Sequence, residues 1–232
     1  MAACYFAAMA YDYDELYRSQ NDALGAPTQA FVDFFATLDQ QELRVLDIGC
    51  GQGRDALFIG RAGHSVVGVD ISPNGVSDLI SAARDESLPV TGIVADIRTF
   101  TPKGMFDILL IDRTLHMLTE VDRLDVLRRL IQHVKSGGWT LIADERSNLA
   151  GFKAVFLEQE VHWTTKVEKR GFLFLRRDQP LVKSSSRDRL PICASVMLVS
   201  SQKTFQSSCS PSSPPAAIAN CSTRPKNAKF AP

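Results

Sequence analysis

Residues 45–53 read VLDIGCGQG, an apolar run that leads into a segment with glycine at every second position. The run is typical of a short buried strand, and residues 54–62 then read as a helix that ends at Gly63. A strand, a glycine-rich turn and a helix in this order place backbone N–H groups and a helix N-terminus beside a ligand. The segment therefore predicts a ligand site at the end of a strand in an α/β protein.

The alternation of strand-like and helix-like segments continues from residue 27 to about residue 145. Strands that are apolar on both faces are typical of a parallel sheet covered by helices on both sides. Ser72 and Thr119 are expected to cap the helices that follow them, and Gly137-Gly138 to end the second of these helices. The further strands are expected at residues 66–71, 90–97, 106–111 and 139–143, with a hairpin of two weaker strands at 162–169 and 172–177.

Three regions are expected along the chain. Residues 1–26 form an N-terminal segment able to act as a lid, and residues 27–182 form the globular domain. Residues 183–232 contain twelve Ser and six Pro but no Gly or Glu, which is typical of a disordered tail. An apolar patch at residues 192–199 leaves open the alternative that the tail adds a strand to the sheet.

The glycine spacing argues against two common nucleotide sites. A dinucleotide fingerprint has its third glycine at the position that Arg54 occupies here, and a phosphate-binding loop requires a Lys that this turn lacks. A nicotinamide-dependent oxidoreductase is thus an alternative that the loop disfavours.

The segment instead resembles the first motif of class I S-adenosylmethionine-dependent methyltransferases along its whole length. Later segments of the chain resemble that family's next motifs in the right order: VGVDIS at residues 67–72, ADI at 95–97, FDILLID at 106–112 and GGW at 137–139. Within the family, residues 51–58 and 63–70, with DELY at 14–17 and GAP at 25–27, resemble the branch of tellurite-resistance and thiopurine methyltransferases. The resemblance implies a Rossmann-like, doubly wound, mostly parallel sheet of seven strands, the last one antiparallel.

The resemblance also implies S-adenosylmethionine as cofactor and assigns the residues that hold it. Asp47 is expected near the amino group of its methionine part, which an anion stabilises. Asp70 is expected to accept the ribose hydroxyls, and Asp96 to accept the adenine amino group, with Ile71 and Ile97 on either side of the ring. The remaining expected cofactor contacts are Gly49, Cys50, Gly51, Gly53 and Asp112. Cys50 is interpreted as a small residue that lets the turn pack rather than as a nucleophile.

Four residues that follow the first and fourth strands are candidates for the acceptor side of the site. Arg54 and Asp112 lie beside the crevice that opens where the strand order reverses. We expect Arg113 or Arg54 to bind an anionic acceptor and His116 to act as a general base, and we expect no metal. Because no dedicated base motif is present, a small acceptor that is soft or already ionised, such as a thiol or a metalloid oxyanion, is favoured. The alternative is a non-catalytic module that binds the cofactor.

Charge and cysteine content bear on partners and location. The formal net charge is zero, which gives no indication of nucleic-acid binding, although the tail is basic and the body mildly acidic. The five cysteines form no closely spaced pair, no run is long enough to span a membrane, and the apolar first ten residues lack a basic start. A cytoplasmic protein is therefore expected, whose partner is a small-molecule acceptor. The oligomeric state stays open.

Overall fold

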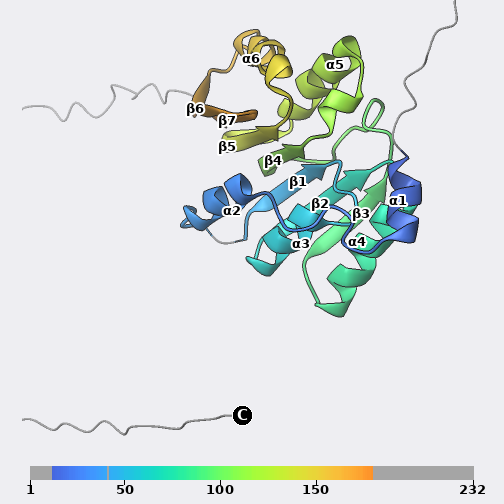
Figure 1. Ribbon diagram of the computed structural model, residues 1–232. Helices are drawn as coiled ribbons and strands as arrows, with labels where there is room; N and C mark the ends of the chain where they lie inside the picture. The colour runs from blue at the N-terminus through green and yellow to red at the C-terminus, as the bar shows by residue number, and fades with distance from the viewer. Residues whose placement is uncertain (1–11, 41, 180–232) are drawn as a thin grey trace, which may run out of the picture. The chain divides into compact units, whose positions relative to one another are not determined.

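The computed structural model describes residues 12–40 and 42–179 (Figure 1). The first eleven residues and the predicted tail at 183–232 lie outside the described residues, so the interpretation of the tail stays a prediction. The described helices and strands, with two short 3₁₀ turns, are α1 (Tyr13–Ser19), α2 (Gln29–Ala36), β1 (Arg44–Ile48), α3 (Arg54–Arg61), β2 (Ser65–Asp70), α4 (Pro73–Asp85), β3 (Val90–Val94), β4 (Phe106–Asp112), η1 (Leu115–Met117), α5 (Glu120–Ile131), β5 (Val134–Ala143), η2 (Arg146–Asn148), α6 (Leu149–Leu157), β6 (Trp163–Lys169) and β7 (Phe172–Arg177).

The seven strands form one sheet in the order β3-β2-β1-β4-β5-β7-β6. Strands β3, β2, β1, β4 and β5 pair in parallel, while β7 is antiparallel to both β5 and β6. The predicted fold class, including a single antiparallel strand at the end of the chain order, is confirmed. Strand β1 lies between β2 and β4 in the interior of the sheet, as the family resemblance implies. The glycine turn that follows β1 is therefore not at an edge of the sheet.

The helices lie on opposite faces of the sheet (Figure 1). Helices α2, α3 and α4 bury Phe31, Ile59 and Leu79 against one face. Helices α5 and α6 bury Leu127 and Phe152 against the other. The side of the connections changes between β1 and β4, and this change opens a crevice at the carboxyl ends of the two strands.

The predicted caps are confirmed, but the role expected for the glycines at 137–138 is wrong. Ser72 Oγ accepts from the Gly75 amide at 2.9 Å, and Thr119 Oγ1 accepts from the Asp122 amide at 3.2 Å. Helix α5 ends at Ile131, and both glycines lie inside β5, which starts at Val134. The pairing of β4 with β5 is irregular there, and a Cβ at position 138 would lie 2.7 Å from the Asp107 carbonyl oxygen. The glycine therefore permits a bulged strand to approach its neighbour.

One strand is shorter than predicted. Strand β3 ends at Val94, so residues 95–97 belong to the loop that follows it. Among the described residues, no helix combines the length and apolarity needed to cross a bilayer.

Gly49 occupies a position that only glycine fits without strain. Its φ is +78°, and a Cβ there would lie 2.0 Å from Thr114 Oγ1. Gly25 has a similar φ of +70° but no atom within 4 Å of the added Cβ. We predict that Gly49→Ala lowers the free energy of unfolding by about 3 kcal/mol or more, because overpacking adds to backbone strain.

The matched variant Gly25→Ala carries the backbone strain alone and should cost about 1 kcal/mol. Urea denaturation of both variants measures the difference. Equal destabilisation would show that Thr114 moves aside without cost.

Candidate active site

The glycine turn joins the carboxyl ends of β1 and β2. The amides of Gly49 and Cys50 donate to the Val69 carbonyl at 2.7 and 3.2 Å, and the Gly53 amide donates to the Cys50 carbonyl at 2.8 Å. The three glycines of the turn all have positive φ, which L side chains rarely adopt. The turn is thus held by its own backbone hydrogen bonds, and its glycines let the side chains of Thr114, Tyr17 and Leu79 approach the main chain closely.

Asp47 is a buried carboxylate at the end of β1, with only 3% of the residue exposed. No hydrogen bond to its side chain is present among residues 12–40 and 42–179. Burial raises the pKa of Asp47 well above its ordinary value, and the nearby carboxylates of Asp55 and Asp112 raise it further. A cation that reached Asp47 would relieve this unfavourable burial of charge.

Asp70 connects the glycine turn with the start of α4. One carboxylate oxygen accepts from the Gly51 amide at 2.8 Å, and the other accepts from the Ser72 amide at 2.9 Å. Ser72 itself caps α4, so Asp70 does not cap that helix with its side chain. Each oxygen has a second lone pair, which leaves the carboxylate able to accept from a ligand hydroxyl.

Cys50 packs inward and is not placed as a nucleophile. Its Sγ would lie 2.8 Å from a Cβ at Gly68, which shows how closely the thiol packs on β2. Burial, with the charges of Asp47 and Asp70, raises the pKa of the Cys50 thiol well above its ordinary value. The interpretation of Cys50 as a small packing residue fits this position.

The residues predicted to contact adenine follow the carboxyl ends of β2 and β3, and they differ in solvent exposure. Ile71 is 64% exposed, whereas Ile97 is buried in the core on the α5 side. The Asp96 carboxylate accepts several hydrogen bonds from Arg98, which hold the pKa of Asp96 below its ordinary value. The adenine contacts of these three residues stay predictions.

Arg54, one of the two candidates for binding an anionic acceptor, is already paired with two carboxylates. Its guanidinium pairs with Asp55 at 2.8 Å and forms a further ion pair with Asp112, and only 13% of its side chain is exposed. Asp112 also accepts from the Thr28 hydroxyl at 2.6 Å. The predicted contact of Asp112 with the cofactor stays a prediction, since the carboxylate already has these partners.

The two predicted catalytic residues follow β4, at the edge of the crevice. Arg113 has a φ of +49°, and its side chain is 60% exposed with Nε 3.2 Å from Asp112 Oδ1. His116 lies in η1, and its Nδ1 is 4.0 Å from Oδ2 of Asp144. Asp144 directly follows β5 and was not among the predicted site residues. A polar residue after the fifth strand was the sequence signal that could have indicated it.

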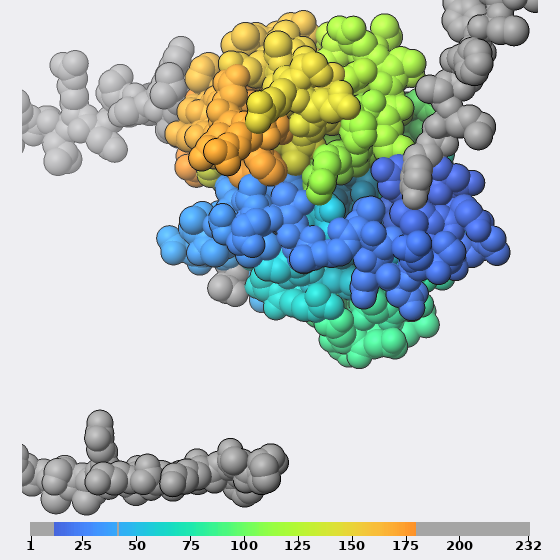
Figure 2. All heavy atoms as spheres, viewed as in Figure 1, coloured from blue at the N-terminus to red at the C-terminus, as the bar shows by residue number. Residues whose placement is uncertain are grey.

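The N-terminal segment contacts the glycine turn and α4 through residues of the motifs quoted above, to which the sequence assigned no role in the site. Asp14 accepts from Ser72 Oγ at 2.5 Å and from the Asn74 amide at 3.1 Å. Gln52 donates to the Gln20 carbonyl at 2.8 Å. The ring of Tyr17 packs over the turn, where its Oη would lie 2.5 Å from a Cβ at Gly51. Figure 2 shows this segment, in blue, extending across the visible face of the molecule.

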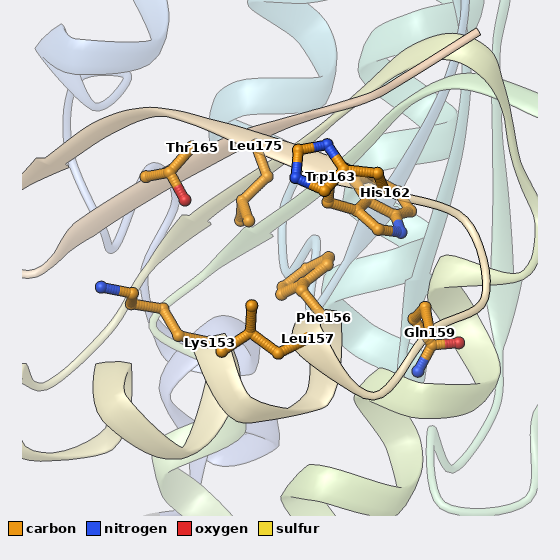
Figure 3. Close-up of a pocket in the computed structure, with 8 residues that line it drawn as sticks. All are labelled: Lys153, Phe156, Leu157, Gln159, His162, Trp163, Thr165 and Leu175. Atoms are coloured by element: carbon orange, nitrogen blue, oxygen red, sulfur yellow. The ribbon is translucent and has the colours of Figure 1, made fainter. Parts of the chain in front are cut away.

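A separate hollow of about 90 Å³ lies between α6 and β6 (Figure 3). Its apolar lining includes Phe156 and Trp163, and its Lys153 pairs with Glu168 at 2.8 Å. It is formed by elements remote from the glycine turn and carries none of the predicted site residues. In the described part of the chain, no three His, Cys, Asp or Glu side chains are grouped as metal ligands.

Comparison with known proteins agrees with this geometry. The model of a methyltransferase domain family matches residues 45–138. A probable S-adenosyl-L-methionine-dependent methyltransferase, TehB of Haemophilus influenzae, is 27% identical over 100 residues, which are 43% of this chain and 35% of that protein. The chain therefore carries a segment that matches the methyltransferase domain family, and it is similar to S-adenosylmethionine-dependent methyltransferases.

Solved structures show the same methyltransferase fold. The crystal structure of TehB from H. influenzae superimposes with a TM-score of 0.53 at 20% identity, covering 67% of this chain and 63% of that one. Magnesium protoporphyrin IX methyltransferase from Synechocystis PCC 6803, with bound S-adenosylmethionine, gives 0.54 at 20% identity over 65% of this chain and 77% of that one.

Coverage of the curated relatives is partial. Hemagglutinin 1 of Eikenella corrodens is 31% identical over 99 residues, which are 43% of this chain and 33% of that protein. The chain thus spans about a third of the length of the first two of these relatives.

The buried carboxylate of Asp47 should destabilise the ligand-free methyltransferase domain. Its pKa is raised by folding, so the wild type loses stability as pH rises from the ordinary value of 3.8 through the raised pKa. We predict that Asp47→Asn raises the free energy of unfolding at high pH by about 0.5–2 kcal/mol, since it removes a buried charge.

Below pH 3.8 the two proteins should converge, because Asp47 is then protonated in both the folded and the unfolded state. Thermal unfolding at a series of pH values measures this. A stability difference that does not change with pH would contradict the raised pKa.

Proposed function

We propose that this chain is an S-adenosylmethionine-dependent methyltransferase that acts on a small molecule. The observation that carries the proposal is the buried carboxylate of Asp47, which accepts no hydrogen bond in the described part of the chain and lies beside the glycine turn. The methionine part of the cofactor has an ammonium group, which suits an anion that lacks a partner.

The residues present fit the cofactor in three further respects. Asp70 at the end of β2 is proposed to accept the ribose hydroxyls with the lone pairs that its backbone partners leave free. Gly49, Gly51 and Gly53 are proposed to let the ligand approach the main chain. Asp96 and the exposed Ile71 are proposed to contact adenine.

The cofactor supplies an electrophilic methyl group on a sulfonium, which an acceptor displaces in line. The chain's part in this reaction is alignment and exclusion of water. The N-terminal segment is proposed to cover the bound ligand, because Asp14 and Gln52 already tie it to α4 and to the turn. Arg113 and His116 are proposed to face the acceptor from the end of β4.

Removing the Asp70 carboxylate should weaken the binding of S-adenosylhomocysteine. Charged hydrogen bonds contribute about 1.5–3 kcal/mol each and overlap in effect, so Asp70→Ala should cost about 2–4 kcal/mol. This corresponds to about a 30- to 700-fold rise in Kd, measured by calorimetry.

Asp85→Ala, an exposed change at the other end of α4, serves as the control and should leave Kd unchanged. Thermal unfolding of both variants separates loss of binding from loss of fold. Unchanged affinity in a folded Asp70→Ala protein would disprove the ribose contact, and binding of NADH in place of the methyl donor would disprove the function.

Two classes of acceptor are distinguished by whether a proton must be removed. A thiol or a metalloid oxyanion attacks as an anion, and the absence of a base motif in the sequence favours this class. A hydroxyl or an amine requires a base, and the position of His116 beside Asp144 favours that class. The names of the relatives include an N-terminal methyltransferase and O-methyltransferases, so they do not select between the classes.

We predict that the purified protein transfers a labelled methyl group to at least one small acceptor. A panel of thiols, metalloid oxyanions, phenols and amines, followed by mass spectrometry, measures the transfer. Binding of the cofactor without transfer to any acceptor in the panel would favour the non-catalytic alternative.

A further inference from the structure

His116 has a buried ring nitrogen that lacks a hydrogen-bond partner. Among the described residues, no acceptor or donor is in hydrogen-bond range of Nδ1. Its side chain is nevertheless 29% exposed, and this exposure belongs to other atoms of the side chain because Nδ1 is buried. A buried polar atom without a partner costs about 1–3 kcal/mol, so the ring gains from any small shift that supplies one.

The carboxylate of Asp144 lies where such a partner is needed. Its Oδ2 is 4.0 Å from Nδ1 and accepts from the His116 backbone amide at 3.1 Å. Hydrogen bonds of catalytic groups are often long in the absence of ligands and shorten in the reacting complex. A small rotation of the His116 side chain, with its backbone amide still bonded to Asp144, would bring Nδ1–H into hydrogen-bond range of Oδ2.

Asp144 is itself held in one orientation. Its Oδ1 accepts from the Glu145 amide at 2.8 Å and from Asn148 Nδ2 at 2.7 Å, and its side chain is fully buried. Its own amide donates to the Gly171 carbonyl in the turn between β6 and β7. The hairpin at the end of the sheet thereby fixes a carboxylate beside the crevice.

We propose that Asp144 is a positioning residue, which accepts a hydrogen bond from Nδ1–H of His116 and leaves Nε2 unprotonated toward the acceptor. The inference rests on the proposed methyl transfer and specifies its substrate class: a neutral hydroxyl or amine. Such a group needs a base, whereas a thiolate or an oxyanion would not require the pair.

The proton and the electrons balance in a single displacement. The proton of the acceptor's O–H or N–H passes to Nε2 of His116 as the oxygen or nitrogen forms a bond to the methyl carbon. The carbon–sulfur bond breaks, and its electron pair stays on sulfur. The imidazolium, which Asp144 stabilises, then releases its proton to water.

Asp144→Asn tests the positioning role because the two carboxylate oxygens have different neighbours. Two donors face Oδ1 and one faces Oδ2, so the amide oxygen should occupy the Oδ1 position and the NH₂ group should face Nδ1. The ring would then hold its proton on Nε2, where it cannot accept another.

The tautomer is measured by NMR of the imidazole nitrogens in the full chain, with His116→Gln used to assign the signal. We expect the Nδ1–H form in the wild type and the Nε2–H form in Asp144→Asn. With a hydroxyl or amine acceptor, kcat should fall by about 100-fold or more in both Asp144→Asn and His116→Gln. The Kd of S-adenosylhomocysteine should change by less than about twofold in either variant.

Asp178→Asn is the matched control. It alters a second His–Asp pair, in which His162 Nδ1 lies 2.6 Å from Asp178 Oδ2 on an exposed surface. This variant should leave both the His116 tautomer and kcat unchanged.

The outcomes separate this inference from the proposed function. An Nε2–H tautomer in the wild type, or an unchanged tautomer and kcat in a folded Asp144→Asn protein, would overturn the positioning role. Full activity of His116→Gln on a hydroxyl or amine would overturn the base. If the tautomer changes as expected but no methyl donor binds, the proposed function is wrong and the positioning of His116 stands.

Discussion

The hydrogen bond from the Gly51 amide to the Asp70 carboxylate is the contact on which the site depends. It joins the turn after β1 to the end of β2, and the same carboxylate also accepts from the start of α4. Because both strands are parallel and adjacent, their carboxyl ends meet at one edge of the sheet. The glycine turn and two carboxylates, those of Asp47 and Asp70, therefore lie close together at this edge.

The acidic groups around this turn are held at a cost to stability. Burial and the neighbouring Asp112 carboxylate raise the pKa of Asp47 and of Asp55, and Arg54 offsets part of this effect. Arg54 thus stabilises the free protein and leaves Asp47 as the acid without a partner. Because Arg54 pairs with the other two carboxylates, Asp47 is the one left to interact with a cationic ligand.

Elements at the two ends of the described chain complete the site. The segment around α1 contacts the turn through Gln52 and α4 through Asp14, and the hairpin of β6 and β7 holds Asp144 through Gly171. Of the two, only the segment around α1 carries a stretch that resembles the family, at residues 14–17. The α1 segment places Asp14 beside α4, and the hairpin of β6 and β7 holds Asp144 beside the crevice. Elements remote from the glycine turn thus position side chains near it.

The sequence by itself determined the strands, most helix ends and the cofactor turn, since each depends on local chemistry. The apolar run before Gly49 and the apolar segment at residues 66–71 indicate buried strands, and the two weaker segments at 162–169 and 172–177 indicate the hairpin. The family resemblance supplied the strand order, which the structure confirms.

Only the tertiary structure decided which side chains are free and which are paired. Arg54 looked available for an anion because its partner Asp112 lies 58 residues away in the chain. Asp144 and His116 are 28 residues apart and meet only because β4 and β5 are neighbours. Gly137-Gly138 resembled a helix stop, yet they permit a bulge against β4. Such pairings arise from the packing of distant segments, which no local pattern encodes.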